Sequence, residues 1–138
     1  MGTWAVDAFG NDYAQDWAED LAETSNLDAV EDTLDTALDT GAGELEAPFA
    51  AEALVAIEVL ARLQGKGGAT GEDSAAVDAW VEARKPKARR RADLEDKALR
   101  VIARILSERS ELRELWAESE RYEAWRASVE ELRGRLVP

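Results

Sequence analysis

The residues whose types and spacing are best suited to chemistry are carboxylates that recur four positions apart. Such spacing places both members of a pair on one face of a helix. Five such pairs lie near the start of the chain: Asp12/Asp16, Asp16/Asp20, Asp28/Asp32, Glu31/Asp35 and Asp35/Asp39. Two carboxylates act as general acid and base only where burial or a neighbouring charge separates their pKa values. These pairs lie opposite the apolar positions of their own segments, so we expect water around them and no catalytic role.

Two residue types that carry much of protein chemistry, cysteine and histidine, do not occur in the chain. Their absence excludes disulfides, thiolate nucleophiles, a histidine general base and Cys/His zinc sites. The nucleophile motifs GxSxG and SxxK are also missing, and the glycine-rich residues 65–71 lack the GxxxxGK[ST] spacing of a phosphate-binding loop. We therefore expect no enzyme activity and no cofactor.

Oxygen ligands alone can bind Ca²⁺ or Mg²⁺, provided that several of them converge. The closest candidate is residues 35–46, DTALDTGAGELE, which does not have the D-x-[DN]-x-[DN]-G pattern of a calcium loop. A protein that binds a divalent metal through its carboxylates is therefore kept as a hypothesis, ranked after the two protein-binding hypotheses given below.

The charge of the chain is strongly asymmetric. The 138 residues have a net charge of −13, of which residues 1–83 contribute −17 and residues 84–138 contribute +4. The electric field of such an acidic surface repels nucleic acid and attracts basic proteins. The alternative is that the acidic surface only keeps the protein soluble. The carboxylates that crowd one predicted helix are the expected partner contacts: Asp28, Glu31, Asp32, Asp35 and Asp39.

Residues 84–91, RKPKARRR, hold six basic side chains in eight positions. Such a run can contact phosphates, but we expect it to lie against acidic helices of its own chain or of a second subunit. Core packing is the default expectation for all five tryptophans, and Trp116 is also a further candidate contact. It stands beside the apolar positions Leu112 and Leu115, flanked by charged residues, and a large aromatic at such an edge suits a protein interface.

The apolar spacing along the chain is helical throughout, and no run of alternating β-branched residues appears. Residues 49–63 are apolar except for Glu52, Glu58 and Arg62, which predicts a central helix packed on more than one side. Asn11 or Asp12 is the expected N-cap of the first helix. The apolar positions of residues 110–136 predict one long helix that is weakest at residues 118–121. We predict an all-α protein.

More specifically, residues 1–138 are predicted to form a single domain, a compact bundle of five or six helices with a short extended N-terminal segment. No apolar run reaches about 18 residues, so we expect no membrane span. Because the start of the chain also lacks the features of a secretory signal, we expect a cytoplasmic protein.

Both ends of the chain resemble a known family. Residues 1–17, MGTWAVDAFGNDYAQDW, are similar to the opening pattern MGxW…F.ND.A.DW of the bacterial family catalogued as domain of unknown function 4259 (DUF4259), and residues 110–136 resemble its closing segment. One local departure is at residues 5–9, AVDAF, where family members often have GxGPF. The resemblance implies a small, acidic, mostly helical bacterial protein with no assigned activity, so it supplies no functional residues.

These observations favour a non-enzymatic protein-binding module. Our first hypothesis is an immunity- or antitoxin-like protein whose acidic half covers a basic surface, such as the nucleic-acid site of a nuclease. The alternative is a self-associating structural or scaffold protein, in which the acidic half meets residues 84–91 of another copy, and Trp116 and the 112–136 stripe lie between the subunits. In either case we expect no nucleic-acid partner and no membrane partner.

Overall fold

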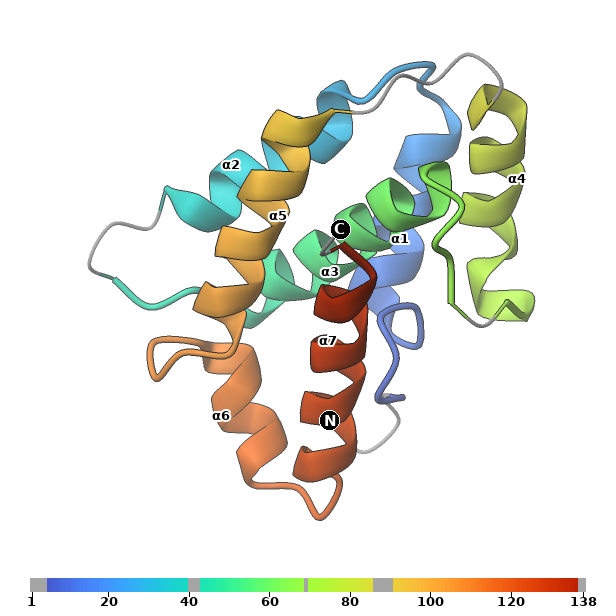
Figure 1. The fold of residues 1–138 in the computed structure, drawn as a ribbon. Helices are drawn as coiled ribbons and strands as arrows, with labels where there is room; N and C mark the ends of the chain where they lie inside the picture. Colours follow the sequence, from blue (N-terminus) through green and yellow to red (C-terminus); the bar gives the residue numbers. More distant parts are fainter. Residues whose placement is uncertain (1–4, 40–42, 69, 86–90, 137–138) are drawn as a thin grey trace.

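The computed structural model describes residues 5–39, 43–68, 70–85 and 91–136. These residues form seven α-helices and one short 3₁₀ helix, η1 (Figure 1). In chain order the elements are α1 (Asp12–Ala22), α2 (Asp28–Leu38), α3 (Ala47–Leu63), η1 (Glu72–Ser74), α4 (Ala75–Arg84), α5 (Ala92–Ile105), α6 (Glu111–Ala117) and α7 (Tyr122–Leu136). The all-α prediction is confirmed, with one helix more than the five or six expected.

Helix α3 is the centre of the fold, as its apolar sequence predicted. It packs against all six other α-helices, and Figure 1 shows it between them. Thirteen of its 17 residues are buried, and six of these are alanines whose small side chains let neighbouring helices approach closely. Pro48 lies in its first turn, where a missing N–H costs no helical hydrogen bond.

The end of α3 is set by Gly65. Its φ of +75° lies in the left-handed region, which residues with a Cβ rarely adopt. The Gly65 N–H donates to Arg62 O and the Lys66 N–H donates to Ala61 O, which is the Schellman pattern that satisfies the last carbonyls of a helix. The first of the glycine-rich residues 65–71 therefore ends α3, which fits a segment that connects two helices.

The outer helices pack in pairs against α3. Helices α2 and α5 lie side by side on one flank, and α1 and α4 lie together on the other (Figure 1). All seven α-helices contribute side chains to one hydrophobic cluster. Helix α2 packs against α3 and α5, and its Thr33 hydroxyl accepts from the Trp17 indole N–H of α1 at 2.8 Å, while Asp28, Asp32 and Asp35 of α2 are exposed.

The N-terminal segment before α1 is a compact turn that covers the core. The Asp7 carboxylate accepts hydrogen bonds from the backbone N–H groups of Phe9 and Gly10, at 2.9 and 3.0 Å. Phe9 is buried, and Asn11 is the N-cap of α1, with its side-chain oxygen accepting from the Ala14 N–H at 2.9 Å. Asn11 is therefore the cap of the first helix, which confirms one of the two residues expected there. Trp4 lies outside the described residues.

The predicted terminal helix is divided at its weakest part. Helix α6 ends at Ala117 and α7 begins at Tyr122, and the Ser119 N–H donates to Trp116 O between them. The break turns the chain back, so that the Trp116 and Trp125 rings stack with centroids 6.2 Å apart. Trp116, expected by default in the core and otherwise at the edge of an interface, is a core residue that is 3% exposed. The interface alternative depended on one unbroken helix, which would have left this ring at the margin of its stripe.

A short backbone clip fastens the start of α3 to the start of α6. The Leu45 N–H donates to Arg109 O at 2.8 Å, and the Glu111 N–H donates to Leu45 O at 2.9 Å. The Glu111 carboxylate also accepts from the Ala47 N–H at 2.7 Å, which satisfies one of the free N–H groups of the first turn of α3. Among the described residues this isolated bridge is the only β-type pairing.

None of the helices in the described ranges combines the length and apolarity needed to cross a lipid bilayer.

Replacing the N-cap of α1 tests the local signal that begins this helix. Asn11→Ala should lower the free energy of unfolding by about 1 kcal/mol, because the Ala14 N–H loses its acceptor. Asn11→Ser keeps an oxygen acceptor and should remain close to wild type. Urea unfolding followed by circular dichroism measures both, and equal losses in the two variants would contradict the capping role.

The clip carries a cluster of glutamates whose repulsion should appear as a pH effect. Partial desolvation, followed by the charges of Glu114, Glu111 and Glu46, raises the pKa of Glu44. A carboxyl whose folded-state pKa is raised contributes stability that is present at low pH and is lost as pH rises through that pKa. Glu44→Gln should therefore be more stable than wild type at neutral pH, and this gain should vanish at about pH 3.

Urea unfolding at several pH values measures that difference. Glu19→Gln, which removes an exposed carboxylate from α1, is the control and should show no comparable gain at neutral pH. A Glu44→Gln variant that is no more stable than wild type at neutral pH would contradict the proposed repulsion.

Candidate functional site

The exposed face of α2 carries a line of four aspartates, Asp28, Asp32, Asp35 and Asp39, which we name the aspartate ridge. Asp39 is the C-cap of α2. Their spacing of four, three and four residues keeps them on one side of the helix, opposite the buried residues of α2. All four are exposed, while Glu31 is half-buried at the edge towards α5. The structure thus brings together the acidic residues that the sequence predicted as partner contacts.

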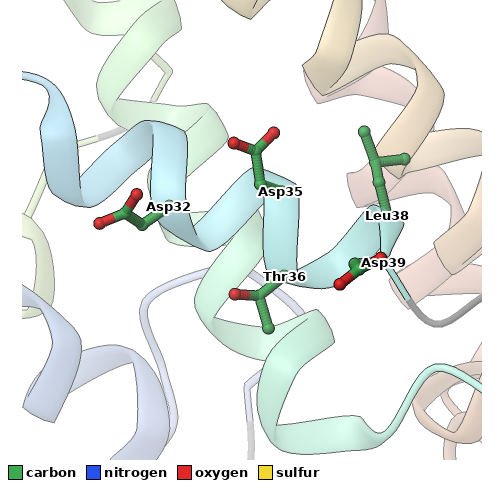
Figure 2. Close-up of a pocket in the computed structure, with 5 residues that line it drawn as sticks. All are labelled: Asp32, Asp35, Thr36, Leu38 and Asp39. Atoms are coloured by element: carbon green, nitrogen blue, oxygen red, sulfur yellow. The ribbon is translucent and has the colours of Figure 1, made fainter.

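The C-terminal half of the ridge borders an open hollow of about 510 Å³. Its lining residues are Asp32, Asp35, Thr36, Leu38 and Asp39, drawn in Figure 2. In that view Asp35 and Leu38 lie towards the upper edge of the exposed face of α2, and Asp32, Thr36 and Asp39 lie along its front and lower edge. A partner side chain that enters the hollow therefore meets carboxylates from successive turns of the helix.

Helix α5 supplies cations to one edge of this surface. The Lys97 ammonium lies 2.8 Å from Asp35 Oδ1 and 3.5 Å from Glu31 Oε2. The Arg91 guanidinium lies 3.7 Å from Glu31 Oε2 and 2.9 Å from Asp93. The hydrogen bond to Asp35, which outweighs partial desolvation, raises the pKa of Lys97, so this ammonium stays charged at neutral pH.

The remaining ridge residues have no such counter-ions. Asp28, Asp32 and Asp39 take part in none of the ion pairs among the residues that the structure describes. These three exposed carboxylates therefore have no ion-pair partner within the part of the chain that the structure describes. Because these carboxylates are exposed, their position suits ion pairing at the surface.

Metal binding has no candidate centre in the described ranges, where no group of three or more carboxylates is arranged to hold an ion. The basic run 84–91 is described only at its ends. Arg84 stacks on Trp80 and donates to Thr24 O at 2.6 Å, and Arg91 contacts Glu31 of α2. Residues 86–90 lie outside the described residues.

The self-association hypothesis placed Trp116 and the apolar stripe of residues 112–136 between two subunits, but this stripe packs within a single chain. Leu112, Trp116, Trp125 and the later apolar positions of α7 are buried in the core of one chain. An interface between copies would need other surface residues.

A buried network of charges was missed by the sequence reasoning, which treated Glu58 and Arg62 only as interruptions of an apolar band. Glu58 is 7% exposed and Arg62 is 6% exposed. Arg135 of α7 donates to both oxygens of Glu58, at 3.0 and 2.9 Å, and Arg62 donates to Asp78 at 3.0 Å. The only available signal was that charged residues stood inside an otherwise continuous apolar helix.

The network forms the floor of a second pocket, of about 330 Å³. The Arg62 guanidinium lies 5.1 Å from the centre of the Phe9 ring, and Arg135 also donates to Lys66 O at 3.2 Å. Gly68 passes close above Arg135, where a Cβ would come within 3.1 Å of its guanidinium. Phe9, residues 66–68 and α7 are therefore joined through two arginines.

The comparisons with known proteins identify the family. The model of a domain of unknown function, DUF4259, matches residues 2–128. The chain belongs to the DUF4259 family. No curated protein and no solved structure is significantly similar to it. The aspartate ridge and the Lys97 pairs of this DUF4259 protein lie inside the matched residues, and Arg135 lies beyond them.

Removing one charged member of the buried network should lower the free energy of unfolding. Glu58→Gln leaves the Arg135 and Arg62 guanidinium groups without their shared carboxylate, so we expect a loss of about 3 kcal/mol of unfolding free energy. Glu131→Gln removes the exposed partner of Arg135 and should cost less than about 1 kcal/mol. Chemical denaturation compares the two variants, and similar small losses would mean that the buried network contributes little.

Proposed function

We propose that this DUF4259 protein is a non-enzymatic protein-binding module that receives a basic surface of another protein on the aspartate ridge of α2. The observation that carries the proposal is the exposure of three ridge carboxylates, Asp28, Asp32 and Asp39, without counter-ions among the described residues. Neighbouring carboxylates on one helix repel one another and destabilise it. A cationic partner reduces this repulsion.

The charge of the chain supports the same proposal. Residues 1–83, which contain the ridge, have a balance of −17, so a basic protein is attracted before contact. Complementary charge speeds association and fixes orientation more than it adds affinity. An immunity- or antitoxin-like role, in which α2 covers a basic surface that otherwise binds nucleic acid, is the form of the proposal that uses these features best.

The test is capture of a partner with two charge-matched variants. The ridge variant carries Asp28→Lys, Asp32→Lys and Asp39→Lys. The control variant carries Glu118→Lys, Glu120→Lys and Glu123→Lys, which are exposed residues around the α6–α7 turn. Each variant changes the net charge equally, and each places one lysine in the first turn of a helix. Proteins from native lysate are bound at about 50 mM salt and eluted towards about 500 mM, with mass spectrometry of each fraction.

We expect one basic protein to be retained by the wild type and by the control variant, and to be lost from the ridge variant. With that partner purified, the association rate of the ridge variant should be at least about tenfold lower at low salt, and the difference should shrink at high salt. Equal rates for all three proteins would remove the basis of the proposal. Equal losses in both variants would show that only net charge matters.

A further inference from the structure

We propose that Lys97 is a built-in competitor for the aspartate ridge, occupying the position where a partner's lysine would bind and thereby limiting the protein's attraction for basic surfaces. This inference rests on the proposed function and concerns the regulation of the same site. It identifies a residue on α5 that lowers binding, whereas the proposed function concerns the residues on α2 that provide it.

The geometry around Lys97 is that of an ammonium bound between two carboxylates. Its Nζ lies 2.8 Å from Asp35 Oδ1 and 3.5 Å from Glu31 Oε2, and these two acids are four residues apart on α2. The only other cation described near this edge, Arg91, contacts Glu31 at 3.7 Å but lies closer to Asp93, at 2.9 Å. Lys97 is therefore the described cation of α5 that pairs directly with a ridge aspartate, Asp35.

The pair at Lys97 is also placed where it can be exchanged. The side chain of Lys97 is 23% exposed and that of Asp35 is 51% exposed, so solvent reaches the contact. Helices α2 and α5 are joined independently by buried apolar residues, among them Val30 and Leu34 of α2 and Leu94 and Ala98 of α5. Exposed ion pairs add little to stability. Loss of the pair therefore leaves the helix packing in place and frees carboxylates for a partner.

The ligand that fits this arrangement is a surface with several lysines or arginines in a row. The ridge spacing of four, three and four residues corresponds to rises of about 6, 4.5 and 6 Å along the helix axis. A partner helix with basic residues at positions 1, 5, 8 and 12 matches this spacing. Lys97 meets one of the ridge carboxylates from within the chain, and a partner's cation must displace it to engage all four.

The test uses a peptide of defined spacing as the probe. The peptide KAAAKAAKAAAK, capped at both ends and labelled with fluorescein, is titrated by fluorescence anisotropy at about 50 mM salt. Lys97→Met keeps the apolar stem and removes the charge. Arg100→Met is the matched control, because it removes one exposed cation from the same helix, where it pairs with Asp96. Lys97→Arg retains the charge and serves as the rescue.

We expect Lys97→Met to bind the peptide about three- to tenfold more tightly than wild type, and at least about threefold more tightly than Arg100→Met. Lys97→Arg should match wild type, and the differences should disappear at about 500 mM salt. Thermal denaturation checks that all variants are folded.

The outcomes separate this inference from the proposed function. Equal affinities of Lys97→Met and Arg100→Met overturn the competition, while the loss of peptide or partner binding in the ridge variant still supports the ridge. No peptide binding even by Lys97→Met, in which Asp35 has lost its counter-ion, also overturns the competition. Undiminished binding of the captured partner by the ridge variant overturns the proposed function itself.

Discussion

The burial of α3 on all sides is the constraint that the rest of the structure satisfies. A helix with an apolar surface this wide needs neighbours around its whole circumference, and the six other α-helices provide them. The alanines of α3 let these helices approach closely, and Gly65 ends the helix where the chain must turn away. The clip at Leu45 then fixes the start of α3 against α6. The positions of α2 and α5, and hence of the aspartate ridge, follow from this arrangement (Figure 1).

Two kinds of charge in this fold have different physical consequences. Glu58 and Arg62 are buried, so their charges must be compensated inside the protein, and Arg135 and Asp78 supply that compensation. The ridge carboxylates face water, so they can remain charged without partners. The buried network therefore links α3, α4 and α7 into a defined arrangement, whereas the charges of the ridge lie at the exposed surface.

The electrostatic potential of the aspartate ridge depends on α5 as well as on α2. Helix α5 lies beside α2 and presents Lys97 to Asp35 and Glu31, which lowers the negative potential at one edge. Asp28, Asp32 and Asp39 form no ion pair among the described residues, although Asp28 is close enough to Arg91 for their charges to interact. The surface thus changes from an edge whose carboxylates are paired to one without ion pairs among the described residues.

The sequence by itself determined the helical class, the central position of α3, a cap at Asn11 or Asp12 and the line of aspartates on α2. Each of these depends on residues within a few positions of one another, and local spacing is enough to predict them. Only the tertiary structure decided that Glu58 pairs with Arg135, that Lys97 occupies the ridge, and that Trp116 is buried against Trp125. These contacts join residues on different helices. Their formation depends on how the helices pack and on where the chain breaks at residues 118–121, and the spacing within one segment does not determine either.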